Sequence, residues 1–240
     1  MSQGRVLGLI PAKGGSVRLA RKNLRTLGGK PLLQWAIESA GEAACLDRIV
    51  VSTEDAEIAK TARAAGADVP FMRPEHLARD PHGVVDVCLH ALDTLEAKGE
   101  RFSEIAILLP TSPFRRGQHI REALERFRTA GAAFLMSVTQ LDSSLLAAHV
   151  ARDGFMEPLH PEWIGRLGAR TKKEELPTLV KANGAVVVAD VKRLRAERNY
   201  YVYPLACYPM PWPTGLDIDT GEDLHYAEFL LEGGHVPLAA

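Results

Sequence analysis

The segment VLGLIPAKGGSVRLARKN, residues 6–23, determines the fold that we expect for this chain. Val6–Pro11 is a short, continuous apolar run, which is typical of a strand covered on both faces of a sheet. A glycine-rich loop with several basic residues follows it directly. A buried strand ending in such a loop predicts an open α/β sheet whose ligands bind at the carboxyl ends of the strands.

Alternating strands and helices continue outward from this segment to about residue 140. Short apolar runs predict strands at 48–52, 105–109 and 134–138. Apolar residues at helical spacing predict helices at 31–44, 56–65, 84–98 and 118–129. A strand at 185–190, a helix after it and a helix at 222–232 complete the pattern. This alternation predicts a parallel sheet with helices on both faces.

The regular pattern is interrupted between residues 141 and 181. This stretch contains Pro158, Pro161, Pro177 and the charged run TKKEE. Because a structureless loop of this length is unusual inside a compact domain, we expect an insertion with short strands of its own that reaches a partner subunit. The predicted division is an α/β domain of residues 1–140 and 182–240 and an inserted extension of residues 141–181.

Composition excludes several classes of protein. The chain of 240 residues has 29 basic and 30 acidic residues, so no overall positive charge would hold a nucleic acid. The aromatic stretch at 200–212 suits an edge strand and a packed loop better than base stacking. Three widely separated cysteines argue against a disulfide framework or a metal knuckle. We expect a cytoplasmic protein, because no apolar run is long enough for a membrane span or a signal peptide.

The loop after the first predicted strand is suited to a polyphosphate. Its glycines allow the backbone to approach a ligand closely, and Lys13, Arg18, Arg21 and Lys22 concentrate positive charge. The pattern is neither a P-loop nor a dinucleotide fingerprint. The alternative is a solvated basic loop without a ligand.

The segment GLDIDTGEDL, residues 215–224, is the second candidate site. On an extended chain Asp217 and Asp219 share one face, and Ile218 faces the core. Two neighbouring carboxylates repel each other unless a cation balances them, and Mg²⁺ carrying phosphate oxygens would do so. The alternative is that Asp219 or Thr220 only caps the final helix. If both candidate sites share one cleft, they predict nucleotidyl transfer, in which the substrate's own hydroxyl is the nucleophile.

Six ordered motifs resemble those of the acylneuraminate cytidylyltransferases, the CMP-sialic acid synthetase family. They span almost the whole chain: IPAKGGSVRLARKNLRTLGGKPLLQWAI (10–37), IVVSTEDAEIA (49–59), MRPEHLARD (72–80), LLPTSPFR (108–115), KANGAVVV (181–188) and GLDIDTGEDL (215–224). The resemblance implies a three-layer, Rossmann-like and mostly parallel sheet of the nucleotide-diphospho-sugar transferase type, with a small dimerisation extension. It also implies CTP as cosubstrate, Mg²⁺ as cofactor, an acidic sugar as acceptor, and a homodimer, with a tetramer left open.

The resemblance also implies roles for individual residues. Lys22, Asp217 and Asp219 would be catalytic, with Lys22 neutralising the α-phosphate and the two aspartates holding the metal. The implied nucleotide-binding residues are Ala12, Lys13, Gly14, Gly15, Ser16, Lys22, Asn23 and Arg73. The implied substrate-binding residues are Leu109, Thr111, Ser112, Arg170, Asn183, Tyr200 and Tyr201.

Four positions depart from the family pattern. Lys13 replaces an arginine and loses its bidentate geometry, Val84 replaces a hydroxyl-bearing residue, Leu109 replaces a glutamine, and Val187 replaces a tyrosine. Because the phosphate and metal motifs are kept, we expect CMP transfer from CTP to the anomeric hydroxyl of an altered nonulosonic acid. Legionaminic-type and pseudaminic-type sugars and a 3-deoxy-ulosonate are candidates. A catalytically weakened nucleotide-binding relative, or a nucleotidyltransferase with another base or acceptor, are the alternatives.

Overall fold

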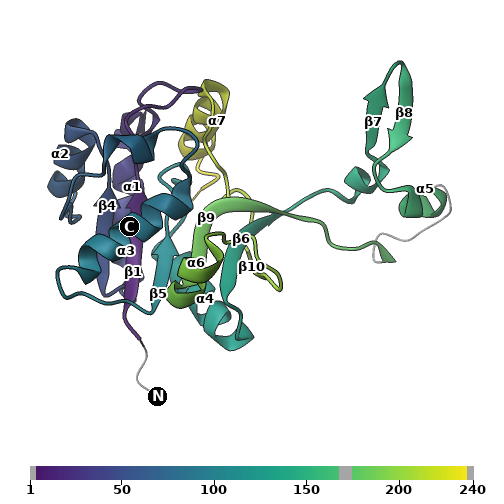
Figure 1. Cartoon of the computed structure of the whole chain (residues 1–240). Coiled ribbons are helices and arrows are strands. Elements are labelled where there is room, and N and C mark those ends of the chain that lie inside the picture. Colours follow the sequence, from purple (N-terminus) through teal and green to yellow (C-terminus); the bar gives the residue numbers. More distant parts are fainter. Residues whose placement is uncertain (1–3, 168–174, 237–240) are drawn as a thin grey trace.

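A six-stranded sheet forms the centre of the molecule in a computed structural model that describes residues 4–167 and 175–236. Its strand order is β10-β6-β9-β5-β1-β4 (Figure 1). The strands are β1 (Val6–Pro11), β4 (Arg48–Ser52), β5 (Glu104–Ile107), β6 (Phe134–Gln140), β9 (Val180–Asp190) and β10 (Ala206–Pro209). Only β9 among these strands runs antiparallel to its neighbours. The sheet is therefore mostly parallel, which confirms the predicted fold class.

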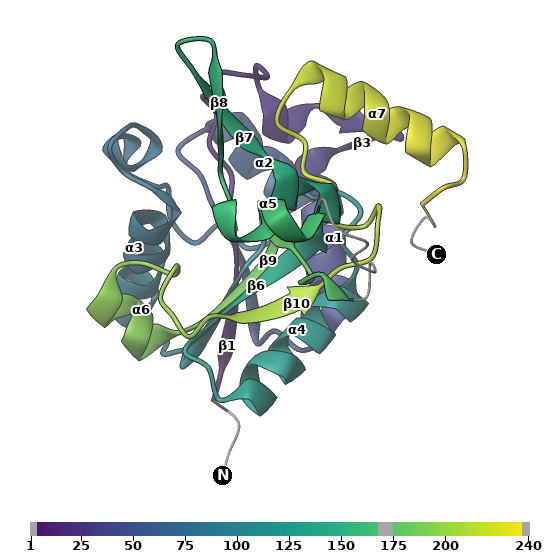
Figure 2. The same cartoon turned by 90° about the vertical axis from the view of Figure 1, so that its right-hand side faces the viewer.

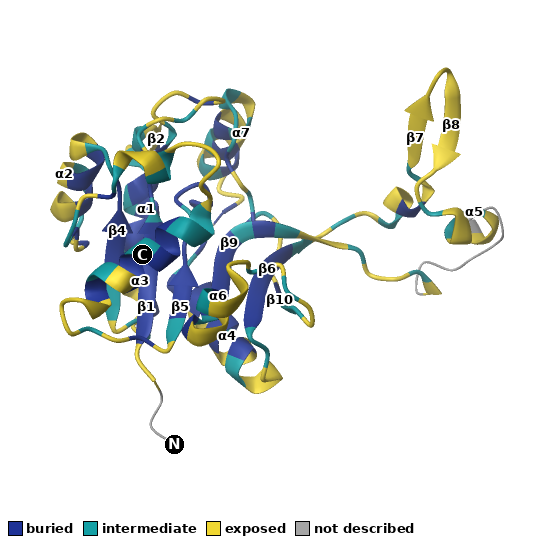
Figure 3. Ribbon diagram, viewed as in Figure 1, coloured by how far each residue is buried: buried dark blue, intermediate teal, exposed yellow. Residues whose placement is uncertain are grey.

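Helices cover both faces of the sheet. One face carries α1 (Leu32–Ala43), α2 (Ala56–Ala64) and α4 (Gly117–Ala130), and the other carries α3 (Val84–Glu96) and α6 (Val191–Glu197). Alternation along β1 explains the two cores, since Ile10 faces one and Leu7 and Leu9 face the other. These three side chains are fully buried. The buried interior between the layers is visible in Figure 3.

A smaller apolar cluster joins the two ends of the chain. Helix α7 (Gly221–Glu232) lies beside the two-stranded ribbon of β2 (Thr26–Leu27) and β3 (Lys30–Pro31) (Figure 2). Leu19 and Leu27 pack here with Ile218 and Leu224. This packing holds the loop that follows β1 close to the segment that precedes α7. Short 3-10 helices, η1 (Lys22–Leu24) and η2 (Glu75–Ala78), lie in the connecting loops.

An arm leaves the domain between β6 and β9. The two strands pair as far as Gln140 and Val180, and the chain beyond them carries η3 (Ser143–Ala147), β7 (His149–Arg152), β8 (Phe155–Pro158) and α5 (Pro161–Leu167). The β7–β8 hairpin projects away from the sheet and is exposed (Figures 1 and 3). Strand β9 is longer than the predicted strand at 185–190, because its first residues pair with β6.

Within the described ranges, none of the helices combines the length and the apolar character that crossing a bilayer requires.

Candidate functional site

A cleft of about 560 Å³ opens beside the carboxyl ends of β1 and β5. The loop after β1, the stretch from Arg73 to Val87, the turn after β5 and the two aspartates before α7 form its walls. Nine of the predicted site residues line it: Lys13, Ser16, Lys22, Asn23, Arg73, Leu109, Thr111, Asp217 and Asp219. The two candidate sites, 197 positions apart between Lys22 and Asp219, therefore share one cleft.

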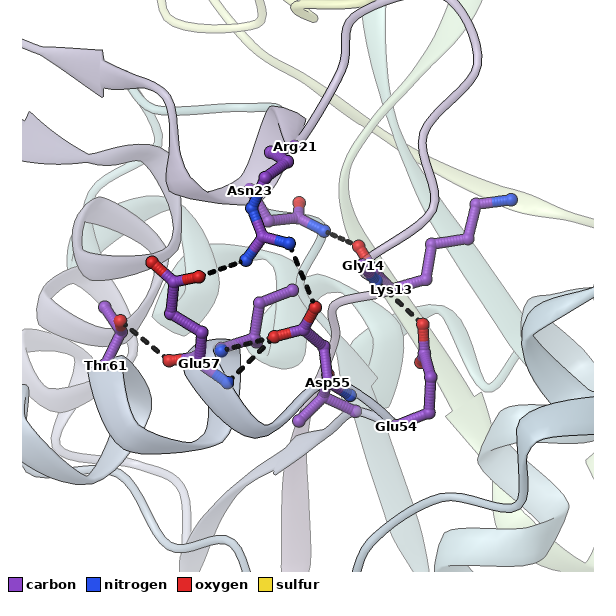
Figure 4. A network of polar contacts seen from close by, with 10 residues as sticks. Lys13, Gly14, Arg21, Asn23, Glu54, Asp55, Glu57 and Thr61 are labelled. Atoms are coloured by element: carbon purple, nitrogen blue, oxygen red, sulfur yellow. Dashed lines mark hydrogen bonds and ion pairs between the residues drawn. The ribbon is translucent and has the colours of Figure 1, made fainter.

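The glycine-rich loop is held by hydrogen bonds to its backbone. Asn23 Nδ2 donates to the Lys13 carbonyl at 2.8 Å, and the Gly14 N–H donates to Glu54 Oε1 at 2.7 Å (Figure 4). The Lys13 side chain extends away from these contacts (Figure 4). Asn23 is buried and serves the loop conformation through this bond, whereas Lys13 is exposed at the cleft.

Glu54 connects this loop to Arg73. Its second carboxylate oxygen forms an ion pair with the Arg73 guanidinium, whose side chain is only 3% exposed. Arg73 Nε is buried without a hydrogen-bond partner among the described residues, although the residue lines the cleft. Glu54 was not among the predicted site residues. Its position two residues after the strand that ends at Ser52 is the signal that could have identified it.

Asp219 is bound by two cations of the loop. Lys22 Nζ lies 2.8 Å from its Oδ1, and Arg18 NH1 lies 2.8 Å from its Oδ2. The helix cap is a different residue, because the Thr220 side chain accepts from the Asp223 N–H. Thr220 is thus the cap, as one half of that alternative expected, and the half that assigned the cap to the Asp219 side chain is wrong. Ile218 is fully buried between the two aspartates, as the alternation predicted.

Asp217 lies in a less favourable electrostatic environment than Asp219. The walls of the cleft remove water from its carboxylate and raise the pKa, although the residue as a whole is still accessible. The nearby negative charge of Asp219 raises the pKa further, and a hydrogen bond from the Thr111 side chain and the charge of Lys22 oppose the rise. The Ile218 N–H donates to the Thr111 carbonyl at 2.8 Å and fixes the segment against the turn.

The donor set of this cleft fits a magnesium ion shared with a ligand. Asp217 and Asp219 supply two carboxylates, and no group of three or more His, Cys, Asp or Glu side chains within the described residues could enclose a metal. Mg²⁺ is commonly bound through one or two carboxylates, substrate phosphates and water rather than by a complete protein cage. A shared ion therefore suits these residues better than a permanently enclosed one.

A second pocket of about 210 Å³ adjoins the cleft at Val84, Leu109 and Asp217. It brings together four of the predicted substrate-binding residues: Leu109, Asn183, Tyr200 and Tyr201. The Asn183 side chain is already engaged, because its Oδ1 accepts from Ser137 Oγ and its Nδ2 donates to Thr139 Oγ1 at 3.1 Å.

The remaining predicted residues lie elsewhere. Ala12 and Ser112 are buried and line neither pocket. Gly14 and Gly15 belong to the loop but are not among the residues that line the cleft. Arg170 lies outside the described residues. The roles predicted for all of these residues stay predictions.

The chain is similar in sequence to proteins of known activity. The sequence model of the cytidylyltransferase family matches residues 7–152. The chain is 32% identical over 95% of its length to a CMP-N,N'-diacetyllegionaminic acid synthase from Legionella pneumophila, covering 97% of that protein. It is 27% identical over 95% of its length to a pseudaminic acid cytidylyltransferase from Campylobacter jejuni, covering 96% of that protein.

The fold is similar to that of a solved CMP:2-keto-3-deoxy-manno-octonic acid synthetase complexed with CTP. The TM-score is 0.70, the sequence identity is 16%, and the match covers 96% of this chain and 99% of the other.

Proposed function

The chain belongs to the cytidylyltransferase family, and we propose that it transfers CMP from CTP to the anomeric hydroxyl of a nonulosonic acid and releases pyrophosphate. The observation that carries this proposal is the single cleft in which the basic loop faces Asp217 and Asp219. The names of the similar proteins, which make or use legionaminic and pseudaminic acids, support a nonulosonic acid as acceptor.

The cationic side chains of the loop bind the triphosphate in this proposal. Lys13, Arg18 and Lys22 all line the cleft, and Ser16 adds a hydroxyl donor. Lys22 and Arg18 form ion pairs with Asp219. The oxygens of a bound triphosphate would be further negatively charged partners for these two side chains. Lys22 then stabilises the charge that grows as the bond between the α-phosphorus and the pyrophosphate oxygen breaks.

Asp217 is the residue that we assign to the proton of the acceptor hydroxyl. It lies where the nucleotide cleft meets the second pocket, and a carboxylate there can act as a general base. As the anomeric oxygen forms its bond to the α-phosphorus, the hydroxyl proton passes to the Asp217 carboxylate. When bound by Asp217 and Asp219, Mg²⁺ would supply positive charge to the phosphate oxygens.

The assembly that we propose is a cytoplasmic homodimer. Phe155, Met156 and Leu159 on the arm are 75%, 74% and 56% exposed in the single chain. Exposed apolar side chains grouped on a projecting hairpin are typical of a surface that another subunit covers. The three cysteines are unpaired, as is usual in a reducing compartment.

Pyrophosphate release tests the proposal. CTP, Mg²⁺ and a panel of nonulosonic acids should give pyrophosphate with at least one acid and none without an acid. Thermal shifts with CTP, GTP, UTP and ATP identify the base, because a ligand at 100 times its Kd stabilises the fold by about 2.7 kcal/mol. Stabilisation by CTP without turnover on any acid would instead indicate the catalytically weakened relative.

A further inference from the structure

Arg115 is a buried arginine to which the proposed reaction assigns no role. It is 2% exposed, and burial lowers the pKa of its guanidinium to about 9, so the group keeps its charge at neutral pH. Its hydrogen bonds go to uncharged groups. Nε donates to Ser39 Oγ at 3.2 Å, and Nη1 donates to the carbonyls of Leu109 at 3.0 Å and Ala185 at 2.7 Å.

The two carbonyls belong to strands that separate at the edge of the cleft. The antiparallel pairing of β5 with β9 ends at Ile107 and Val187. Continued by two residues, the same register would place Leu109 opposite Ala185. A single nitrogen of Arg115 binds the carbonyls of these two residues instead. The guanidinium therefore joins the strands beyond the end of their ladder and fixes the start of the turn that follows β5.

This turn, residues 109–112, carries the contact with the catalytic segment. The Thr111 carbonyl accepts from the Ile218 N–H at 2.8 Å, and the Thr111 side chain forms a hydrogen bond with Asp217. Thr111 and Asp217 both line the cleft. A shift of the turn would therefore shift the Asp217 carboxylate relative to a bound substrate.

The charge of Arg115 has a cost that an apolar side chain would avoid. A buried cation without a carboxylate partner is unfavourable, and its Nη2 is buried without a hydrogen-bond partner among the described residues. A planar guanidinium, however, donates in fixed directions and so holds several acceptors in one arrangement. The position of the turn is what these bonds determine.

We propose that Arg115 is a positioning residue, whose guanidinium fixes the turn that places Asp217 for reaction with the acceptor hydroxyl. The inference rests on the proposed function, because Asp217 receives the proton in that proposal.

Arg115→Met removes the donors and keeps a long side chain. With saturating CTP and a nonulosonic acid that the protein accepts, kcat should fall by roughly 10- to 100-fold, because small misplacements of a reacting group are costly. Titration calorimetry should still give the CTP stoichiometry and Kd of the unchanged protein, since the basic loop after β1 is a separate part of the cleft. A merely structural role would instead lower the fraction of molecules that binds CTP together with kcat.

Arg121→Met is the matched control. Arg121 lies on α4, and its Nη1 also donates to two backbone carbonyls, those of Glu42 at 2.9 Å and Ala43 at 3.3 Å. It does not line the cleft, so its variant should keep kcat. Arg115→Lys keeps the charge without the planar fork, and its kcat should lie between those of Arg115→Met and the unchanged protein.

Thr111→Val tests the route from Arg115 to Asp217. It removes the hydroxyl that bonds to Asp217 and keeps the side-chain volume. Because both changes then act on one carboxylate, Thr111→Val combined with Arg115→Lys should lose less kcat than the product of the two single losses. Losses that multiply would show that Arg115 does not act through this turn.

The kinetic outcomes separate this inference from the proposed function. Unchanged kcat in Arg115→Met, or an equal loss in Arg121→Met, would overturn the inference and leave the proposed function standing. If Arg115→Met does not fold, unchanged kcat in Arg115→Lys would overturn it in the same way. No reaction of the unchanged protein with any nonulosonic acid would overturn the proposed function, and this inference with it.

Discussion

Asp217 and Asp219 have different surroundings although one residue separates them. Each carboxylate oxygen of Asp219 contacts a cation, Lys22 or Arg18. The walls of the cleft and the negative charge of Asp219 raise the pKa of Asp217. Two carboxylates with different partners suit different tasks in one site. We therefore expect Asp219 mainly to bind charge and Asp217 mainly to accept a proton.

Removing the Asp219 carboxylate should stop catalysis without unfolding the protein. For Asp219→Ala we expect kcat to fall by about 10²-fold or more, because one of the two carboxylates proposed to hold Mg²⁺ is lost. The melting temperature should stay close to that of the unchanged protein. Glu222→Ala is the control, since this acidic residue is three positions away and does not line the cleft. Full activity of Asp219→Ala with Mg²⁺ would refute the metal assignment.

The raised pKa of Asp217 predicts a pH-dependent stability cost. The Asp217 carboxyl stays protonated to a higher pH in the folded state than in the unfolded state. The free energy of unfolding therefore decreases as the pH rises from the unfolded-state pKa to the folded-state pKa. Asp217→Asn should therefore raise the melting temperature near pH 7.5. The gain should shrink as pH falls towards the ordinary aspartate pKa of about 3.9. Turnover should be lost in the same variant. Melting curves across pH would speak against this account if the variant were less stable at every pH.

Gly14 is the position at which the loop tolerates no side chain. A Cβ atom there would lie 2.5 Å from Asp55 Oδ2 and 3.0 Å from Asp55 Cβ, whereas a Cβ at Gly15 would meet nothing within 4 Å. Asp55 is fixed because it caps α2 through the N–H groups of Glu57 and Ile58. Gly14→Ala must therefore displace the loop that the Gly14–Glu54 bond holds.

Such a displacement should weaken nucleotide binding. For Gly14→Ala we expect the KM for CTP to rise about tenfold or more, since small misplacements of binding groups are costly. Gly15→Ala should have a smaller effect. Steady-state kinetics on the two variants decide between a steric role and a general need for glycine. Equal losses in both would argue against the contact with Asp55.

Local sequence patterns predicted most of the helices and strands, because the formation of these elements depends largely on neighbouring residues. The strand at Val6–Pro11 has the bounds that its apolar run indicated, and the helix predicted at 84–98 is observed at Val84–Glu96. The antiparallel direction of β9 and its early start at Val180 depend on pairing with β6 and β5. Such pairings between distant segments leave no periodic signal in one sequence.

The same distinction applies to the candidate site. Clustered residues, such as the basic loop and the two aspartates, were found from the sequence. Glu54 was missed because a glutamate after a strand resembles an ordinary solvated charge, and its bonds to Gly14 and Arg73 form only on folding. The engagement of Asn183 by Ser137 and Thr139 depends in the same way on the pairing of β6 with β9.

At the scale of the whole molecule, the arm should hold two subunits together. Phe155→Glu places a charge on an arm side chain that is 75% exposed in the single chain, so the dimer should dissociate. Sedimentation velocity at micromolar concentration would then show monomers. Phe229→Glu on α7 is the matched control, because this aromatic side chain is 61% exposed and lies away from the arm. Dissociation by Phe229→Glu but not by Phe155→Glu would place the interface elsewhere.

The most direct measurement of the central claim is ³¹P NMR of the complete reaction. With CTP, Mg²⁺ and a nonulosonic acid that the protein accepts, one phosphodiester signal of a CMP-sugar should appear for each pyrophosphate, and neither should form when the acid is left out. Unchanged CTP, or pyrophosphate accompanied by free CMP whether or not the acid is present, would contradict transfer to a sugar at this cleft.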